Sequence, residues 1–347
     1  MALYNTYRPQ TFSSLIGQES AVAGLTSIID KGDIRNPDGE QGKTYLFSGP
    51  RGCGKTSAAR IFAKAINCEN LQGNEPCNEC THCTEITEGI SFSVDEIDIA
   101  SSNGVDSIRD LSKTLDVSVD SNKKVYILDE AHMLTEQASN AFLKRLEEPP
   151  SHVVFILVTT DPHKLIKTVR SRCIPFFFTL VPAPLMETLL RSIVEQEGLN
   201  ISDEALMQSI SKGGGSVRDT LSNLEALALT GDIFTSHSYK LVQELAKKNV
   251  QGVFTAIAQT AQEGSSMRSF AEETLSILRD VFLVQMGSEA LVISPDWGHR
   301  KDVADYMGPK NTVKAIELVG EAISAMSAGY DERVNLEVNL ARFCAMK

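Results

Sequence analysis

The chain has 347 residues, of which 42% are hydrophobic and 22% are charged. This length and balance favour two or three globular domains with ample core. The formal charge of −12, from 33 basic and 45 acidic side chains, argues against a protein that coats nucleic acid non-specifically, although a local patch or helix N-termini can still bind phosphates. No apolar run is long enough to span a membrane, and polar residues interrupt the first ten positions, so we expect a cytoplasmic protein without membrane contact, whose cysteines are reduced, buried or ligating.

The first 43 residues have the composition of a peripheral lead-in to a core. Proline and glycine punctuate residues 7–18, and an amphipathic helix is expected over about 20–30. Composition alone assigns no chemistry to this segment.

A phosphate-binding loop follows. Residues 49–56 read GPRGCGKT and match the P-loop pattern G-x-x-x-x-G-K-T. A β-rich run at 44–47 precedes the loop and a helical pattern at 57–67 follows it, which favours a P-loop over a chance glycine-rich turn. Lys55 is expected to reach the β/γ-phosphates, and the Thr56 hydroxyl to bind Mg²⁺. The residues expected to hold the nucleotide here are Gly49, Gly52, Gly54, Lys55, Thr56 and Ser57.

Four cysteines come next, with the spacing C-x8-C-x2-C-x2-C. Each x2 step lets two thiolates bend around one ion, so the set predicts a structural zinc site with four thiolate ligands and no open position for catalysis. A disulfide does not suit the cytosol, and a redox pair remains an alternative that needs fewer cysteines. His82 lies inside the cluster and is expected to be a bystander. The expected zinc ligands are Cys68, Cys77, Cys80 and Cys83.

A strand is expected over 94–99 and a helix over 103–115. The start of this helix carries cap residues and free N–H groups, so it can bind an anion; an ordinary capped surface helix is the alternative.

The next strand, residues 125–130, is apolar without alternation, which is typical of a strand buried on both faces of a parallel sheet. It ends in Asp129 and Glu130, the Walker B arrangement, in which Asp129 holds the Mg²⁺ shell and Glu130 polarises the attacking water. Two acids can also end an ordinary strand, but a P-loop earlier in the same βαβ series favours the active role. A helix over 136–147 follows.

A fourth buried strand covers 153–160 and ends in a pair of threonines, at the edge where open α/β sheets bind ligands. Thr160 is a candidate sensor of the γ-phosphate, and a β-branched strand end is the alternative. A last short strand is expected over 174–178. Arg172, just before it, has no obvious partner in its own site and can point outward to serve a neighbouring subunit as an arginine finger.

From residue 181 onward, helical patterns replace strands, beginning with helices over about 185–197, 203–212 and 216–229. Arg218 lies in the first turn of the third helix, where the macrodipole disfavours a cation. A phosphate ligand would explain this placement, and a solvated surface arginine is the alternative. The remaining residues, 237–347, read as further helices with apolar faces, which indicates a bundle suited to an oligomerisation collar.

Taken in order, these motifs resemble the AAA+ ATPases of DNA polymerase clamp loaders. The resemblance covers about residues 4–235 and rests on strings that are weak alone and specific together: YRPQTF, GPRGCGKT, the cysteines, EIDIAS, LDEAHML, LEEPP, TTDPHKL, SRC and GSVRD. It implies an α/β P-loop AAA+ domain over 1–180, with a parallel five-stranded sheet, helices on both faces and a zinc module at 68–83. A small helical lid domain over 181–236 and an all-α collar domain over 237–347 would follow.

The resemblance also implies residue roles. Arg172 looks like the arginine finger, Arg218 like sensor 2, and Thr160 like sensor 1, where many clamp loaders carry Asn. The helix start at Ser107 and Arg109 resembles one that tracks the DNA backbone, which would reconcile DNA binding with the negative net charge. The implied Walker A pair is Lys55 and Thr56, the Walker B pair is Asp129 and Glu130, and the adenine-side wall is Arg8, Pro9, Ile16 and Gly17.

The implied function is that of an ATP-hydrolysing motor subunit that opens a sliding clamp and loads it onto primer–template DNA. Its implied cofactors are ATP, Mg²⁺ and Zn²⁺, and its implied partners are copies of itself and delta-like subunits in a ring at the replisome. The chain ends at the collar, so the short form of such a subunit is expected. One alternative is a non-hydrolysing scaffold subunit, which should have a broken P-loop or lack Glu130. The other is a different AAA+ DNA-remodelling or branch-migration ATPase, against which the zinc module argues.

Overall fold

The computed structural model describes residues 2–35, 43–101, 123–230, 237–264, 266–288, 292 and 297–346. The helix expected over 103–115, with Ser107 and Arg109 at its start, lies outside these residues. The chain divides into two compact units. The first unit comprises Met1–Met186 and Gly215–Ser222, and the second comprises Glu187–Gly214 and Asn223–Lys347.

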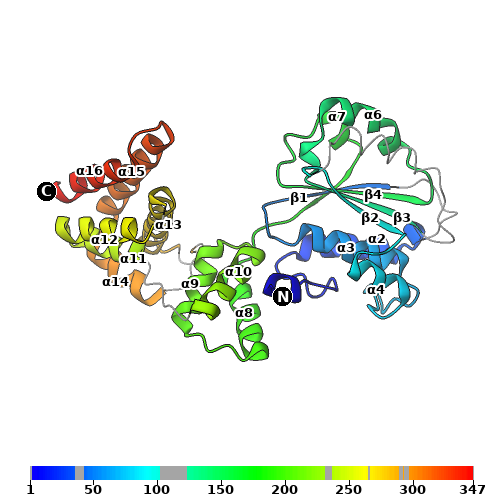
Figure 1. The fold of residues 1–347 in the computed structure, drawn as a ribbon, viewed down its shortest axis with the longest axis horizontal. Coiled ribbons are helices and arrows are strands. Elements are labelled where there is room, and N and C mark those ends of the chain that lie inside the picture. Colours follow the sequence, from blue (N-terminus) through cyan, green and yellow to red (C-terminus); the bar gives the residue numbers. More distant parts are fainter. Residues whose placement is uncertain are drawn as a thin grey trace. The chain divides into compact units, whose positions relative to one another are not determined.

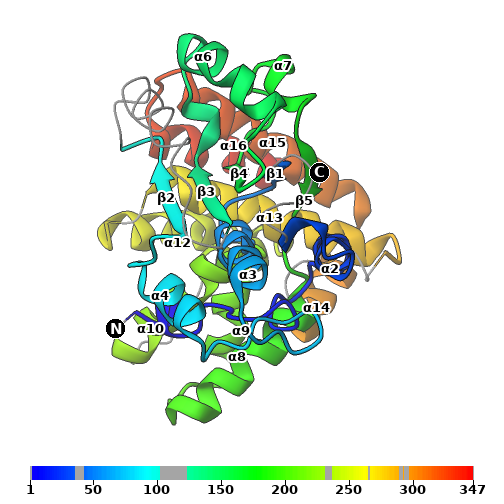
Figure 2. The same ribbon diagram turned by 90° about the vertical axis from the view of Figure 1, so that its right-hand side faces the viewer.

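The first unit is built on five strands: β1 (Lys43–Ser48), β2 (Val94–Asp98), β3 (Lys124–Asp129), β4 (Val153–Thr159) and β5 (Ile174–Phe177). They form one sheet in the order β2-β3-β4-β1-β5, with every pairing parallel. Figure 2 shows β2 and β3 side by side with their arrowheads pointing the same way. Because parallel strands end at one edge, the loops after β1, β3 and β4 meet there.

Helices cover both faces of this sheet (Figure 1). One face carries α2 (Glu19–Asp30), α3 (Lys55–Asn67) and α4 (Thr81–Glu88), and the other carries α6 (Glu136–Glu147) and α7 (Lys167–Arg170). The short elements α1 (Leu3–Thr6), η1 (Asp33–Arg35) and η2 (Ala131–Met133) complete the unit. Helix α3 is almost wholly buried, because it lies directly behind the P-loop and fills the space between the sheet and the outer helices.

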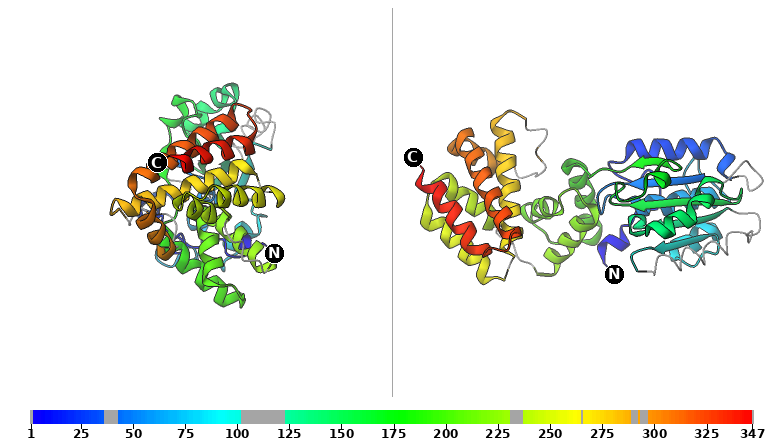
Figure 3. Two further views of the ribbon diagram at one scale, coloured as in Figure 1. Left: turned by 90° about the vertical axis from the view of Figure 1, so that its left-hand side faces the viewer. Right: turned by 90° about the horizontal axis from the view of Figure 1, so that it is seen from above.

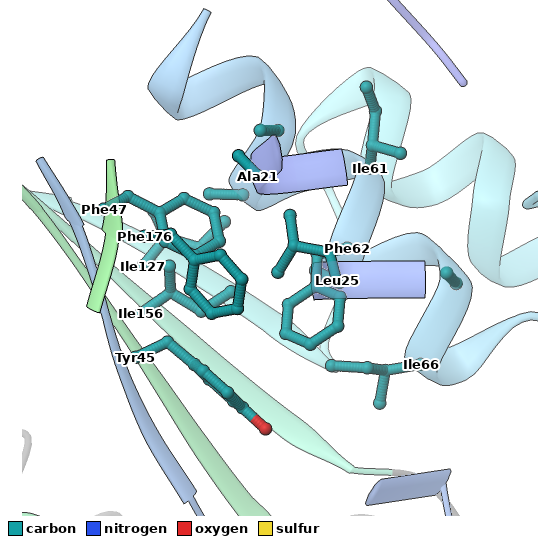
Figure 4. Packing of buried hydrophobic residues seen from close by; sticks show 14 of the residues in the cluster. Ala21, Leu25, Tyr45, Phe47, Ile61, Phe62, Ile66, Ile127, Ile156 and Phe176 are labelled. Carbon is teal, nitrogen blue, oxygen red and sulfur yellow. The ribbon is translucent and has the colours of Figure 1, made fainter. Parts of the chain in front are cut away.

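Aromatic side chains fill the core between the sheet and α3 (Figure 4). Tyr45 meets Phe62 edge-on with ring centroids 5.2 Å apart, and Phe47 meets Phe176 in the same way at 5.6 Å. All four rings are less than a tenth exposed. Burial of such a side chain stabilises the fold by about 1.5–3 kcal/mol relative to leaving it in water, so this layer fixes α3, and the loop before it, on the sheet.

The second unit is helical. Helices α9 (Asp203–Gly213), α11 (His237–Ala246), α12 (Val250–Gln262), α13 (Met267–Gln285), α14 (Trp297–Met307), α15 (Pro309–Ser327) and α16 (Glu332–Ala345) belong to it, and α8 (Ala183–Glu197) and α10 (Val217–Thr230) are shared with the first unit. Helices α11–α16 form a bundle, coloured yellow to red in Figure 3, around one cluster of buried apolar residues. Among the described residues, no helix is both long and apolar enough to cross a membrane.

The expected fold class is confirmed: a parallel five-stranded sheet with helices on both faces, followed by a mostly helical carboxyl-terminal part. The strands lie within one residue of their expected bounds. The apolar pattern predicts helices over 253–261, 270–286, 313–328 and 336–346, whereas α12, α13, α15 and α16 each begin three or four residues earlier. Polar cap residues explain this shift, since Asn249, Ser266 and Asp331 accept bonds from the first turns of α12, α13 and α16. Helix α4 was not expected, because few of its residues are apolar, and α14 was not distinguished as a separate helix within the helical pattern of 237–347.

The Tyr45 hydroxyl offers a test of this core. It is buried, and no hydrogen-bond partner reaches it among the described residues; its burial raises the pKa of Tyr45. Because an unpaired buried hydroxyl costs free energy, we expect Tyr45→Phe to raise the free energy of unfolding by about 1 kcal/mol. Phe62→Ala, which removes the ring that Tyr45 packs against, should lower it by about 3–5 kcal/mol. Urea denaturation followed by circular dichroism measures both changes, and a destabilised Tyr45→Phe protein would contradict the unpaired hydroxyl.

Candidate nucleotide-binding site

The P-loop needs glycine where other parts of the first unit approach its backbone. Gly52 has φ +74°, and a Cβ there would lie 1.9 Å from Ser216 Oγ. Gly49 has φ +152°, and a Cβ there would lie 2.2 Å from the Phe178 carbonyl oxygen. A side chain at either position would displace the loop, so these glycines allow β5 and the start of α10 to close around it.

Lys55 is held inside the loop. Its Nζ donates to the carbonyl oxygens of Gly49 at 2.8 Å and Pro50 at 2.6 Å. Burial lowers the pKa of Lys55, while Cys53, Glu130 and Asp129 act in the opposite direction. A buried cation that donates to neutral carbonyl oxygens is a strong attractor for an anion at the same place.

The structure brings the two Walker motifs together. The Thr56 hydroxyl donates to Asp129 Oδ2 at 2.9 Å, which joins the start of α3 to the end of β3. Glu130 follows in the left-handed region at φ +49°, and its Oε2 accepts from the Thr160 hydroxyl at 3.4 Å. A hydroxyl and a carboxylate side by side at the carboxyl edge of a sheet are suitable ligands for Mg²⁺ and its water shell.

His132 is a site residue that the sequence analysis missed. It lies on η2, with Nδ1 3.3 Å from Glu130 Oε2 and 3.1 Å from the Thr159 hydroxyl. It therefore restricts the direction in which the Glu130 carboxylate points. The only signal in the sequence is a histidine two positions after the acidic pair, which by itself is not specific.

Arg218 also lies at the loop. The N–H of Val217 donates to the Gly52 carbonyl oxygen at 3.0 Å, so the first turn of α10 contacts the P-loop directly. Ser216 caps that turn by accepting from the Asp219 N–H at 3.2 Å. The Arg218 guanidinium lies 5.1 Å from the centre of the Tyr4 ring, a cation–π contact that the sequence analysis did not foresee.

Positive charge gathers beside the loop. Burial lowers the pKa of Arg8, and the nearby Arg60 and Arg218 lower it further, while Glu96 opposes them. Glu96 is held by Arg60 through two bonds of 2.6 and 2.9 Å. A bound anion would therefore relieve repulsion within this group. A cavity of about 220 Å³ opens here, lined by Asn5, Arg8, Pro9, Gln10, Ser57, Arg60, Ile61, Lys64, Ile86 and Thr87.

The rest of the expected adenine-side wall lies on another flank of the loop. A Cβ added to Gly17 would be 3.4 Å from Pro182, and one added to Gly54 would be 3.4 Å from the Leu15 side chain. Ile16, which lies between Leu15 and Gly17 in the sequence, is half-buried. Pro9 and Ile16 therefore belong to the same amino-terminal stretch without sharing one cavity.

Arg172 is placed apart from these residues. Its guanidinium lies 3.3 Å from Glu147 Oε2 and donates to the Thr168 carbonyl oxygen at 2.9 Å. The contacts that the described residues show for Arg172 thus lie at the ends of α6 and α7, and they do not include the P-loop.

The four cysteines converge on one point, with their sulfur atoms within 4.8 Å of one another. The Cys77 N–H donates to Cys68 Sγ and the Cys80 N–H donates to Cys77 Sγ, both at 3.3 Å. Sulfur atoms about 3.8 Å apart are what a tetrahedral metal–thiolate site with bonds of about 2.3 Å requires, so this cluster can hold a metal ion. His82 is not part of it, because its Nε2 lies 3.4 Å from Glu69.

Sequence comparisons show which known proteins this chain is similar to. A family profile described as "DNA polymerase III, delta subunit" matches residues 18–181. The chain is 37% identical over 99% of its length to a protein of Mycobacterium tuberculosis named DNA polymerase III subunit gamma/tau, of which it covers 62%. It is 35% identical over 99% of its length to the DNA polymerase III subunit tau of Bacillus subtilis, of which it covers 63%.

Among solved structures, the chain is similar to a protein of Thermotoga maritima described as related to the DNA polymerase III gamma subunit, with a TM-score of 0.41. The two are 18% identical, and the similarity covers 93% of this chain and 98% of the other.

Thiol labelling tests the electrostatics of the cysteines. Backbone N–H groups of Glu79 and Cys80 lower the pKa of Cys77 to about 6, whereas burial raises the pKa of Cys173 to about 12. At pH 8 in metal-free protein, Cys77 should be a thiolate and Cys173 a thiol, so iodoacetamide should modify Cys77 at least about 100-fold faster. Mass spectrometry of digested samples over time gives the two rates, with metal-loaded protein as the control in which Cys77 is protected. Equal rates of modification of Cys77 and Cys173 in the metal-free protein would contradict the difference in pKa between the two thiols.

Proposed function

Because the chain belongs to the DNA polymerase III gamma/tau family, we propose that it is an ATP-hydrolysing motor subunit of a clamp loader. The observation that carries the proposal is the contact between Thr56 and Asp129 at 2.9 Å. It lies beside Lys55 of the P-loop, and the first turn of α10, which carries Arg218, contacts the same loop. The chain spans about 62–63% of the length of the curated relatives above.

In this proposal each residue acts on the triphosphate or on the attacking water. The P-loop N–H groups and Lys55 would bind the phosphates, and Thr56 and Asp129 would hold a Mg²⁺ ion, which would supply positive charge to the triphosphate. Glu130, directed by His132 and Thr160, orients the water and accepts its proton. Arg218 places a further positive charge at the loop.

Arg172 would act on a neighbouring subunit. Its position away from its own P-loop, with an exposed glutamate as partner, supports a role as an arginine finger in trans, which makes hydrolysis depend on assembly. We propose a ring with copies of this chain and delta-like subunits, which binds a sliding clamp and primer–template DNA in the cytoplasm. ATP would favour the state that binds clamp and DNA, and hydrolysis would release both. The helical parts over 181–236 and 237–347 would be its lid and collar.

The cysteine cluster would hold structural zinc. Four thiolates in a closed set select zinc or an iron–sulfur cluster over hard cations, and we propose zinc as the ion. The ion would stabilise the local fold of residues 68–83, which have little core of their own, and would take no part in hydrolysis.

Lys55→Ala tests the nucleotide site. Removing the ammonium group should reduce ATP affinity at least about 100-fold, because the phosphates lose a charged partner in a buried place. Titration with a fluorescent ATP analogue measures this, and ATP hydrolysis with and without a sliding clamp and primed DNA tests the proposed cycle. Arg51→Ala, at an exposed position of the same loop, is the control and should bind normally. Unchanged affinity in Lys55→Ala would refute the site, and unstimulated hydrolysis by the unaltered chain in the assembled loader would refute the clamp-loading cycle.

Arg172→Ala tests the role in trans. The variant should bind ATP with unaltered affinity but lose about 10³-fold or more in hydrolysis by the assembly, as for related arginine fingers. Mixing it with Glu130→Gln, which should bind ATP without hydrolysing it, locates the defect. If the finger acts in trans, activity returns only at interfaces that pair an intact Arg172 with an intact Glu130. Normal hydrolysis by an Arg172→Ala monomer would exclude the role.

A further inference from the structure

The cysteine module, residues 68–83, contacts the amino-terminal segment, residues 8–13. Glu75 in the module accepts from the backbone N–H of Phe12 at 2.6 Å and from that of Ser13 at 2.7 Å, with one carboxylate oxygen for each. Hydrogen bonds to an ionised carboxylate are about twice as strong as neutral ones. The module is thus fastened to the backbone of a segment more than sixty positions earlier in the chain.

A second contact lies at the other end of this segment. Lys64 of α3 is 1% exposed, and its Nζ donates to Gln10 Oε1 at 2.5 Å and to Asn78 Oδ1 at 3.0 Å. Gln10 in turn donates from Nε2 to the Arg8 carbonyl oxygen at 3.1 Å. One continuous chain of hydrogen bonds therefore runs from Asn78 in the module to the backbone of Arg8.

The position of Glu75 follows from the fold of the module itself. Gln72 and Glu75 exchange two backbone hydrogen bonds, of 3.0 and 3.2 Å, which form a tight bridge. Cys77, two positions after Glu75, points into the sulfur cluster. Because this stretch has little apolar core, an ion held by the four sulfurs would be its main source of rigidity.

Few other hydrogen bonds from distant parts of the described chain reach residues 8–13. The Phe12 side chain is buried, and beyond the segment Gln18 exchanges two hydrogen bonds, of 2.8 and 3.0 Å, with Thr179. Among the described residues, the hydrogen bonds that reach 8–13 from positions after 18 come from Glu75 and Lys64. The direction in which Arg8 and Pro9 line their cavity therefore depends on these two side chains.

We propose that the cysteine module is a bracket that holds residues 8–13 in place for the nucleotide, with Glu75 as a positioning residue that links metal binding to nucleotide affinity. This inference rests on the proposed function for the role of Arg8 and Pro9, and on the structure alone for the bracket. In this role the module supports nucleotide binding, although its four cysteine ligands take no part in hydrolysis.

Glu75→Gln in the full chain tests the bracket, because it keeps the shape of the side chain and removes its charge and one acceptor. Glu79→Gln is the matched control, since Glu79 is an exposed carboxylate of the same module for which the described residues show no side-chain partner. Zinc content per chain, hydrogen exchange at the Phe12 and Ser13 amides, and affinity for a fluorescent ATP analogue are measured on both. Wild-type protein stripped of metal by a chelator provides a second perturbation that alters no residue.

We expect Glu75→Gln to keep its zinc, to exchange the Phe12 and Ser13 amides at least about tenfold faster, and to bind nucleotide about fivefold to tenfold more weakly. Glu79→Gln should match the wild type in all three, and metal removal should reproduce the Glu75→Gln effects. Unchanged amide exchange in Glu75→Gln would overturn the bracket, and faster exchange with unchanged affinity would overturn its link to the nucleotide. If Lys55→Ala loses nucleotide while Glu75→Gln does not, the proposed function stands and this inference fails. If the wild type binds no nucleotide, the proposed function fails, and with it the link.

Discussion

The hydrogen bond between Thr56 and Asp129 ties the start of α3 to the end of β3, and the rest of the site is arranged around it. The P-loop follows β1, and Asp129 ends β3. These two strands are not neighbours, because β4 lies between them in the sheet. The P-loop must therefore cross the end of β4, where the Gly49 N–H donates to the Thr159 carbonyl oxygen at 3.3 Å. Because β3 and β4 are adjacent parallel strands, Thr160 at the end of β4 lies next to Glu130 at the end of β3. The strand order thus sets the positions of the P-loop, Glu130 and Thr160.

Local charge differs from net charge in this chain. The molecule carries a formal charge of −12 overall. Arg60 and Arg218 nevertheless lie close enough to Arg8 to lower its pKa, and Glu96 is the acidic group that opposes them. A polyphosphate entering this region exchanges repulsion among cations for attraction, whereas the acidic remainder of the surface disfavours other polyanions. Selectivity for a small, highly charged ligand at one place follows from this contrast.

The parts of the structure that sequence could predict are those encoded by neighbours in the chain. Continuous apolar runs located the strands at 125–130 and 153–160, and the loop at 49–56 carries its own glycines. Contacts between distant positions left no such pattern: Glu75 with Phe12, Arg218 with Tyr4, and His132 with Thr159 join residues whose spacing has no periodicity. Helix α14 was not distinguished either; of its residues 302–307, whose burial the structure describes, Val303, Ala304 and Met307 are buried.

The placement of Arg172 favours exchange of its partner over permanent pairing. Glu147, the acid it meets at 3.3 Å, is 56% exposed, and an ion pair of this kind contributes only about 0–1 kcal/mol. Moving the guanidinium from that carboxylate to a buried phosphate of a neighbouring subunit would therefore cost little and gain a charge-assisted, desolvated contact. Arg60, by contrast, donates two short hydrogen bonds to Glu96, so separating this pair would cost more free energy. In the proposed ring, the weaker pair is the one that suits a residue that must engage and release in each cycle.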